Sequence, residues 1–126
     1  MIKENCRYTK DHEWIREEGG LFLVGISHHA QDALGEVVYL ELPDSGKDFS
    51  SHDTFGVVES IKAVSDLYCP VSGQVVEANK SLQNDPSQIN SNPYDSWLIK
   101  IKIKNKSEFD TLMDAPAYKK YLEAHG

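Results

Sequence analysis

Lys62 is the residue of this sequence with the clearest potential for chemistry. It lies in the segment Glu59-Ser60-Ile61-Lys62-Ala63-Val64, between two strand-like stretches, and its amine can be acylated. Tight hairpin tips usually carry Asn, Gly, Asp or Pro, because these residues suit the turn geometry. This tip carries Ile61 and Lys62 instead, so turn stability does not explain its composition. We interpret Lys62 as a candidate attachment point for a covalent cofactor, the alternative being an ordinary exposed lysine.

Three acidic residues are candidates for acid–base chemistry, namely Asp11, Glu13 and Asp66. Acidic residues are abundant in this chain, so their presence alone does not indicate catalysis. The sequence also lacks Gly-x-Ser-x-Gly, a phosphate-binding glycine loop and His-Glu-x-x-His. We therefore expect a protein with no catalytic residues of its own.

The histidines do not have the spacing of a metal site. His12 has no His, Cys or acidic partner at such a spacing, which favours packing or hydrogen bonding beside Trp14. His28 and His29 are adjacent, and adjacent residues on a helix point about 100° apart. We expect them at a solvated helix start and predict no metal.

Charge and cysteine content narrow the function classes. The 126 residues contain 13 Lys and Arg against 20 Asp and Glu, a net charge of -7, which argues against nucleic acid or an anionic membrane as partner. Cys6 and Cys69 are too few for a disulfide scaffold, so we expect reduced thiols. Residues 1–5 lack the apolar region of a secretory signal, which predicts a cytoplasmic bacterial protein. A mature mitochondrial protein that has lost its transit segment would look the same.

Apolar periodicity and turn residues predict mainly strands. Strands are expected at 12–16, 21–26, 36–41, 54–59, 64–68, 74–78 and 97–104. Ser27 is placed to cap a short helix at 28–34 that ends at Gly35. Residues 79–96 are interpreted as a loop with at most one helical turn, and helices are expected from Ser107, as a capping box, and from Asp114.

The predicted fold is a mainly antiparallel β-sandwich or flattened barrel, in one domain spanning 1–126. Residues 35–38 (Gly-Glu-Val-Val) recur as 73–76 (Gly-Gln-Val-Val), and two similar halves would suit two packed sheets. Trp14, Tyr39 and Trp97 are expected to anchor the core. The lysines that alternate with isoleucines in the last strand are expected to face water.

From Tyr8 to the C-terminus the chain resembles the H proteins of the glycine cleavage system. The motifs that carry the resemblance are Asp11-His12-Glu13-Trp14, Gly25-Ile26-Ser27, Ala30-Gln31-Asp32, Leu34 to Val38, Glu41-Leu42-Pro43, Glu59 to Asp66, Pro70 to Gly73 and Asn90 to Pro93. The resemblance implies a barrel-sandwich hybrid fold of the lipoyl/biotinyl-carrier type, with lipoic acid joined to Lys62 by an amide. The chain departs from the family pattern at His28 and at Asp95-Ser96-Trp97.

The resemblance also implies a reaction cycle and its partners. The lipoyl arm would receive an aminomethyl group from a pyridoxal-phosphate glycine decarboxylase and pass it to a tetrahydrofolate-dependent aminomethyltransferase. Dihydrolipoyl dehydrogenase would reoxidise the arm, and a lipoate-attaching enzyme would install it. Glu13 and Asp66 match positions of a cleft in which the loaded arm is shielded. A monomeric carrier without catalytic groups is expected.

Other lysine-modified carriers remain as alternatives. A lipoyl domain of a 2-oxoacid dehydrogenase would more usually show Asp-Lys-Ala, and a biotin carrier would place Met on both sides of the lysine, where this chain has Ile61 and Ala63. The nearest rival is an H-like protein that relays lipoyl groups to other enzymes or scaffolds them. That use requires the same modified lysine, so the sequence leaves both open.

Overall fold

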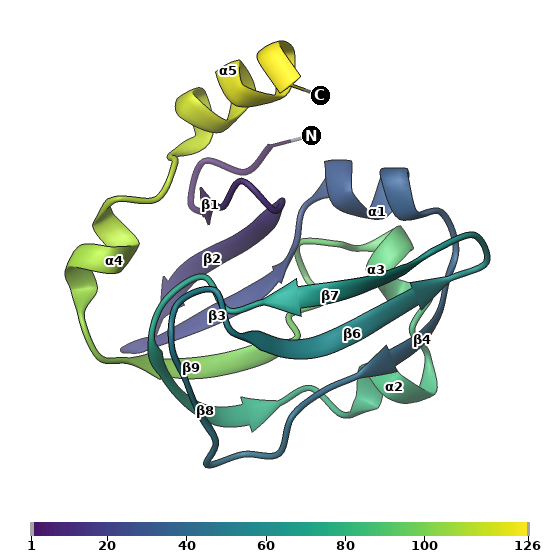
Figure 1. Ribbon diagram of the computed structural model, residues 1–126, viewed down its shortest axis with the longest axis horizontal. Helices are drawn as coiled ribbons and strands as arrows, with labels where there is room; N and C mark the ends of the chain where they lie inside the picture. Colours follow the sequence, from purple (N-terminus) through teal and green to yellow (C-terminus); the bar gives the residue numbers. More distant parts are fainter. Residues whose placement is uncertain (1, 126) are drawn as a thin grey trace.

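Two antiparallel sheets face each other in the computed structural model, which describes residues 2–125 (Figure 1). The larger sheet contains, in spatial order, β1 (Arg7–Tyr8), β2 (Glu13–Glu18), β3 (Leu21–Ile26), β9 (Ile99–Ile103), β8 (Gly73–Ala78) and β5 (Asp48–Phe49). The smaller sheet contains β4 (Val37–Glu41), β6 (Thr54–Ser60) and β7 (Val64–Tyr68). The predicted antiparallel β-sandwich is therefore confirmed.

The main hydrophobic core lies between the two sheets. Strand β9 has the sequence Ile-Lys-Ile-Lys-Ile, and its alternation buries Ile99 and Ile101 while Lys102 remains exposed. The smaller sheet contributes Val58 and Leu67 to the same cluster. Each such side chain stabilises the fold by roughly 1.5–3 kcal/mol when fully buried. This packing fixes the orientation of the β6–β7 hairpin.

Helix α1 (His28–Leu34) follows β3 with both ends capped as the sequence predicts. The Ser27 hydroxyl accepts a hydrogen bond from the Ala30 amide (3.2 Å), which satisfies one free donor of the first turn. The Gly35 amide donates to the Gln31 carbonyl (3.0 Å), and Gly35 has φ 81°, a value that favours glycine. The chain then turns directly into β4.

A second apolar cluster covers the outer face of the larger sheet. Tyr8, Trp14 and Tyr118 are fully buried there. Tyr118 belongs to α5 (Ala115–His125), which lies beside the N-terminal segment (Figure 1). The Asp114 carboxylate accepts a hydrogen bond from the Ala117 amide (2.9 Å), so the predicted start of this helix is confirmed.

Several local predictions were wrong. Two short helices, α2 (Ser81–Asn84) and α3 (Gln88–Ser91), occupy the segment interpreted as a loop. They form because Leu82 and Ile89 are buried in the main core. Helix α4 (Lys106–Asp110) begins one residue before the predicted capping box, because the Asn105 side chain accepts from the Ser107 amide (3.0 Å).

Tyr39 is not a core residue, contrary to expectation. It is 45% exposed, whereas Trp14 is fully buried and Trp97 is half-buried. The register of β4 against β6 shifts between Val37 and Tyr39, which indicates a β-bulge that turns Tyr39 outward. An equivalent shift occurs in β8 after Val75, so the repeated Gly-x-Val-Val segments each begin a bulged strand.

The basic residues of β9 are only partly as predicted. Lys102 and Lys104 are exposed, but Lys100 is half-buried. Its amine lies 4.7 Å from the centre of the Trp97 ring and 3.7 Å from a Glu77 carboxylate oxygen. No helix within residues 2–125 is long and apolar enough to span a membrane.

Candidate functional site: the Lys62 hairpin and its cleft

Lys62 lies at the tip of the β6–β7 hairpin, and Ser60 stabilises the turn. The Ser60 amide donates to the Ala63 carbonyl (2.8 Å), and the Ser60 hydroxyl accepts from the amides of Lys62 (3.3 Å) and Ala63 (3.1 Å). Neither Ile61 nor Lys62 has a positive φ. The Ser60 side chain thus takes over the role that Asn or Gly plays in a common two-residue hairpin.

The tip also rests on the connection between α1 and β4. The Ile61 amide donates to the Glu36 carbonyl (3.1 Å). The stem of Lys62 lies over Gly35, where a Cβ atom would be 3.2 Å from the lysine Cε. Figure 1 shows the β6–β7 tip extending beneath α1 to this connection. The backbone of the tip is thus held by hydrogen bonds on two sides.

The side chain of Lys62 is free for modification. It is exposed, and no acidic residue among those described forms an ion pair with it. Its neighbours Ile61 and Val64 are 71% and 68% exposed. One exposed apolar side chain thus lies on each side of the lysine in the sequence.

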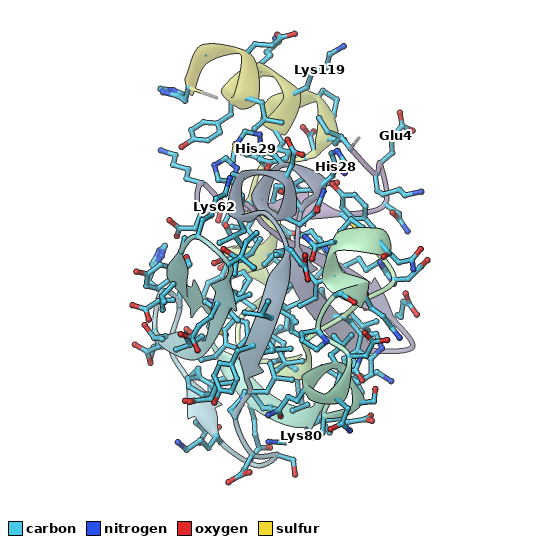
Figure 2. All side chains as sticks on the ribbon, turned by 90° about the vertical axis from the view of Figure 1, so that its right-hand side faces the viewer. Glu4, His28, His29, Lys62, Lys80 and Lys119 are labelled. Carbon is cyan, nitrogen blue, oxygen red and sulfur yellow. The ribbon has the colours of Figure 1, made fainter. Side chains whose placement is uncertain are left out.

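A cleft of about 290 Å³ runs between α1 and β7. Its walls are formed by Asp11, His12, Glu13, Ile26, His29, Ala30, Ala33, Leu34, Val58, Ser65, Asp66 and Leu67. Leu34 lines the cleft and directly precedes Gly35, on which the Lys62 stem lies, whereas His29 lies toward the other end of α1. Six residues separate His29 from Gly35, which corresponds to about 9 Å of helix. Figure 2 shows Lys62 and His29 on the same side of the molecule at α1.

Glu13 lies inside the cleft and is almost completely buried. It is 2% exposed, with one carboxylate oxygen accepting from the Thr9 hydroxyl (2.7 Å) and the other from the Tyr68 amide (3.1 Å). Burial raises its pKa to about 7, although both hydrogen bonds act in the opposite direction. No Lys or Arg among residues 2–125 pairs with it. A cationic group that entered the cleft would find an acidic partner already held in place.

His12 shares this end of the cleft and joins it to α5. Its Nδ1 atom lies 2.8 Å from the Tyr118 hydroxyl, which in turn lies 2.9 Å from the Ser27 hydroxyl. Its ring centre is 4.5 Å from that of His29. Burial, with a smaller contribution from His29, lowers the pKa of His12 and favours the neutral ring. The predicted hydrogen-bonding role is confirmed, and the partner is the Tyr118 hydroxyl.

The structure brings the three candidate acids together. Asp11, Glu13 and Asp66 all line the cleft, and Asp66 is exposed on β7. His28 does not line it, and its ring nitrogen lies 3.2 Å from the Gln31 amide nitrogen. Within residues 2–125 no group of three or more His, Cys, Asp or Glu side chains is placed to hold a metal. The cleft therefore combines apolar walls with an acidic end.

The two cysteines lie away from the Lys62 tip. Both are buried and free of disulfides. Burial raises the pKa of Cys69 to about 12, so its unreactive thiol form dominates at neutral pH.

Sequence reasoning missed what supports the lysine. Gly35 was recognised only as a helix end, yet it also makes room for the Lys62 stem. Ser60 was seen as a small neighbour, whereas it organises the turn. A Ser two residues before an exposed Lys in a hairpin without Asn or Gly is the signal that could have indicated such a turn.

The fold and the tip together define a class: a carrier-type β-sandwich that presents one free lysine on a rigid hairpin. A family model described as glycine cleavage H-protein matches residues 6–125. The chain belongs to this family, whose members are carrier components of the glycine cleavage system.

Individual relatives agree with this assignment. A glycine cleavage system H protein of Thermoanaerobacter sp. (strain X514) is 48% identical over 122 residues, covering 97% of each chain. That of Symbiobacterium thermophilum is 50% identical over 118 residues, covering 93% of this chain and 92% of the relative. The crystal structure of a glycine cleavage system H protein from Mycobacterium marinum superposes with a TM-score of 0.86 at 36% identity, covering 97% of this chain and 99% of that one.

Proposed function

We propose that Lys62 carries lipoic acid as an amide and that the chain is the lipoyl carrier of a glycine cleavage system. The carrier would take the aminomethyl group of glycine from the decarboxylase to the aminomethyltransferase and then present the dihydrolipoyl arm to its dehydrogenase. The observation that supports this most strongly is the free lysine at a braced hairpin tip beside an open cleft. The lipoyl group, when bound, supplies the sulfur atoms that react.

Lys62 suits this attachment because of its surroundings. Its amine is exposed, so an attaching enzyme can approach it. The amide formed is neutral, so the modified side chain can lie along protein surface without the cost of burying a cation. Gly35 leaves space beneath the stem, next to Leu34, which lines the cleft.

The chain's own contribution to the loaded state would come from Glu13 and Asp66. A protonated amine in the cleft would lie near both carboxylates, and a charge-assisted hydrogen bond is stronger in a partly desolvated site. Ile26, Val58 and Leu67 line the same space and limit access of water. His12 stays neutral next to this cation because its pKa is lowered. These residues would protect a labile cargo without catalysing its reaction.

Residues 1–126 would form one carrier domain that acts as a monomer in the bacterial cytoplasm. The catalytic groups would come from the partner enzymes, since the carrier needs only to present its arm.

Reconstitution tests this function. Chain modified by a lipoate-attaching enzyme is mixed with the decarboxylase, the aminomethyltransferase and dihydrolipoyl dehydrogenase in the presence of pyridoxal phosphate, tetrahydrofolate and NAD+, and glycine-dependent NADH formation is measured. We expect NADH formation with the wild type and with Lys119→Arg, which changes an exposed lysine on α5 (Figure 2), but none with Lys62→Arg. Modified wild type that fails to support NADH formation would contradict the glycine cleavage role and favour lipoyl relay.

A further inference from the structure

We propose that Asn90, on α3, is a positioning residue that sets the direction of Lys62 through the connection between α1 and β4. This inference rests on the proposed role of Lys62 as the attachment point. Asn90 touches neither the lysine nor the cleft, so its effect on modification would be indirect.

The carboxamide of Asn90 bonds to both sides of a single residue, Glu36. Its oxygen accepts from the Val37 amide (2.9 Å), and its nitrogen donates to the Gly35 carbonyl (2.8 Å). A neighbouring strand would satisfy these two backbone groups in the same way. The nitrogen also donates to the Gln31 side-chain oxygen (3.1 Å), which ties the bend to the last turn of α1. One side chain therefore holds the whole bend.

The bend in turn holds the lysine tip. Glu36 lies between the two backbone groups that Asn90 binds, and its carbonyl accepts from the Ile61 amide (3.1 Å). Gly35 is the surface on which the Lys62 stem lies. Gly35 is both bonded to Asn90 and in contact with Lys62, and Glu36 is directly adjacent to the two residues that Asn90 binds. A shift of the bend would therefore move the lysine.

Asn90 is itself firmly placed. Its neighbour Ile89 is 1% exposed and belongs to the main core. The Ser96 hydroxyl donates to the Gln88 carbonyl (3.1 Å), and the Asn92 amide donates to the same carbonyl (2.8 Å). Helix α3 thus fixes the bend in place relative to the hydrophobic core. The four-residue helix α3 therefore has a structural role, which is to hold Asn90 in place.

Loss of the Asn90 carboxamide leaves the Gly35 carbonyl and the Val37 amide without their partner. Water can replace it, but water does not fix the bend relative to the core. The tip would then sample several positions. Misplacement of a reacting group by about 1 Å can cost up to about a hundredfold in rate.

The test compares Asn90→Ala with Asn84→Ala. Asn84 ends α2 as an exposed residue, and its side chain forms no hydrogen bond within residues 2–125, so it controls for loss of a helical asparagine. Asn90→Asp serves as a second variant, because it retains the acceptor for the Val37 amide but loses the donor to Gly35. Unfolding by denaturant first establishes that each variant is folded.

Two measurements follow. One is kcat/KM for attachment of lipoate to the unmodified chain by a purified lipoate-attaching enzyme. We expect about a tenfold decrease for Asn90→Ala, mainly in kcat, and no change for Asn84→Ala. The other is amide hydrogen exchange at Ile61, which we expect to be about tenfold faster in Asn90→Ala. Exchange at Leu98, whose amide bonds to Val24 in the sandwich, should not change.

The outcomes separate this inference from the function on which it rests. Attachment kinetics and Ile61 exchange in Asn90→Ala that match Asn84→Ala would overturn the positioning role. Uniformly faster exchange at Ile61 and Leu98 would also overturn it, because the effect would then be general destabilisation. If wild type itself accepts no lipoate, the proposed function fails, and exchange at Ile61 still decides whether Asn90 fixes the tip.

Discussion

The aliphatic stem of Lys62 lies against the bare α-carbon of Gly35, a residue that also ends helix α1. A Cβ atom at Gly35 would lie 3.2 Å from Cε and 3.8 Å from Nζ of the lysine. The end of helix α1 and the candidate attachment point thus meet at one glycine, next to Leu34 of the cleft wall. A substitution of Gly35 should therefore affect modification of Lys62 in two ways: the new side chain occupies the space under the lysine stem, and the backbone becomes strained.

Gly35→Ala tests this contact. Gly35 has φ 81° and ψ -161°, so alanine should lower the free energy of unfolding by about 1–3 kcal/mol. Gly46→Ala is the matched control, because Gly46 has φ 92° but a Cβ atom there would meet no other atom within 4 Å. We expect both variants to lose stability in denaturant, and only Gly35→Ala to accept lipoate more slowly. Equal attachment rates would show that the stem does not need this space.

Glu13 should make stability depend on pH. Its pKa rises from an ordinary value of 4.5 to about 7 on folding, so the folded state binds the proton more tightly than the unfolded state. Stability contributed by the protonated acid is complete below pH 4.5 and is lost as the pH rises to about 7. The full effect is on the order of 3 kcal/mol.

Glu13→Gln should remove this dependence. The variant should gain stability relative to wild type as the pH increases from 4.5 to about 7, measured as the difference in free energy of unfolding. Asp66→Asn changes an exposed acid of the same cleft and should not reproduce the effect. Parallel pH profiles for wild type and Glu13→Gln would show that Glu13 ionises normally in the fold.

Loss of either cleft carboxylate should shorten the life of the loaded carrier. We expect Glu13→Ala and Asp66→Ala to lose the aminomethyl group about tenfold faster, since each removes a charge-assisted hydrogen bond. Decay is followed by intact mass after transfer from the decarboxylase. Asp48→Ala removes an exposed acid on β5, outside the cleft, and should behave as wild type. An unchanged lifetime in both cleft variants would refute protection while leaving the carrier role intact.

The Tyr118 hydroxyl should stabilise the junction of α5 with the cleft. Tyr118→Phe removes the group that lies between His12 and Ser27, and we expect a loss of about 1–3 kcal/mol in denaturant unfolding. Tyr121→Phe is the control, because its hydroxyl makes one long bond to Lys10 (3.4 Å) at the surface. If the two variants lose the same stability, the buried network contributes nothing beyond an exposed hydroxyl.

Local chemistry explains why much of the fold could be predicted. The first hairpin was expected from Gly19 and Gly20, which adopt φ 61° and 84°. Helix α1 was expected from Ser27 and Gly35, which cap it as predicted. Such features depend on residues close in sequence, so they can be predicted without knowledge of the tertiary structure.

The incorrect predictions concern features that depend on distant partners. Strands β1 and β5 are two residues long, too short to give a periodic pattern, and exist through pairing with β2 and β8. Tyr39 faces water because a β-bulge reverses the alternation of buried and exposed side chains in β4, and no single residue type in the sequence indicates a bulge. Helices α2 and α3 form because the core receives Leu82 and Ile89.

The structure locates the predicted site residues and adds supporting contacts that the sequence did not indicate. Lys62, Glu13 and Asp66 were all proposed from the sequence, and the structure places the two acids in one cleft near the lysine. The burial of Glu13 was not expected, because acidic side chains are rarely fully buried. The Asn90 side chain bonds to Gly35, a residue 55 positions away in the sequence, so only the folded chain reveals this contact.

Peptide mass spectrometry of the protein from its native source tests the attachment at Lys62 most directly. Protein from cells grown with lipoate is digested, and the peptide that contains Lys62 is sequenced by fragmentation. We expect the mass increase of a lipoyl amide on Lys62, and unmodified Lys80 and Lys119 in the same sample. A chain with unmodified Lys62 in lipoate-replete cells that lipoylate their other carriers would contradict the carrier function.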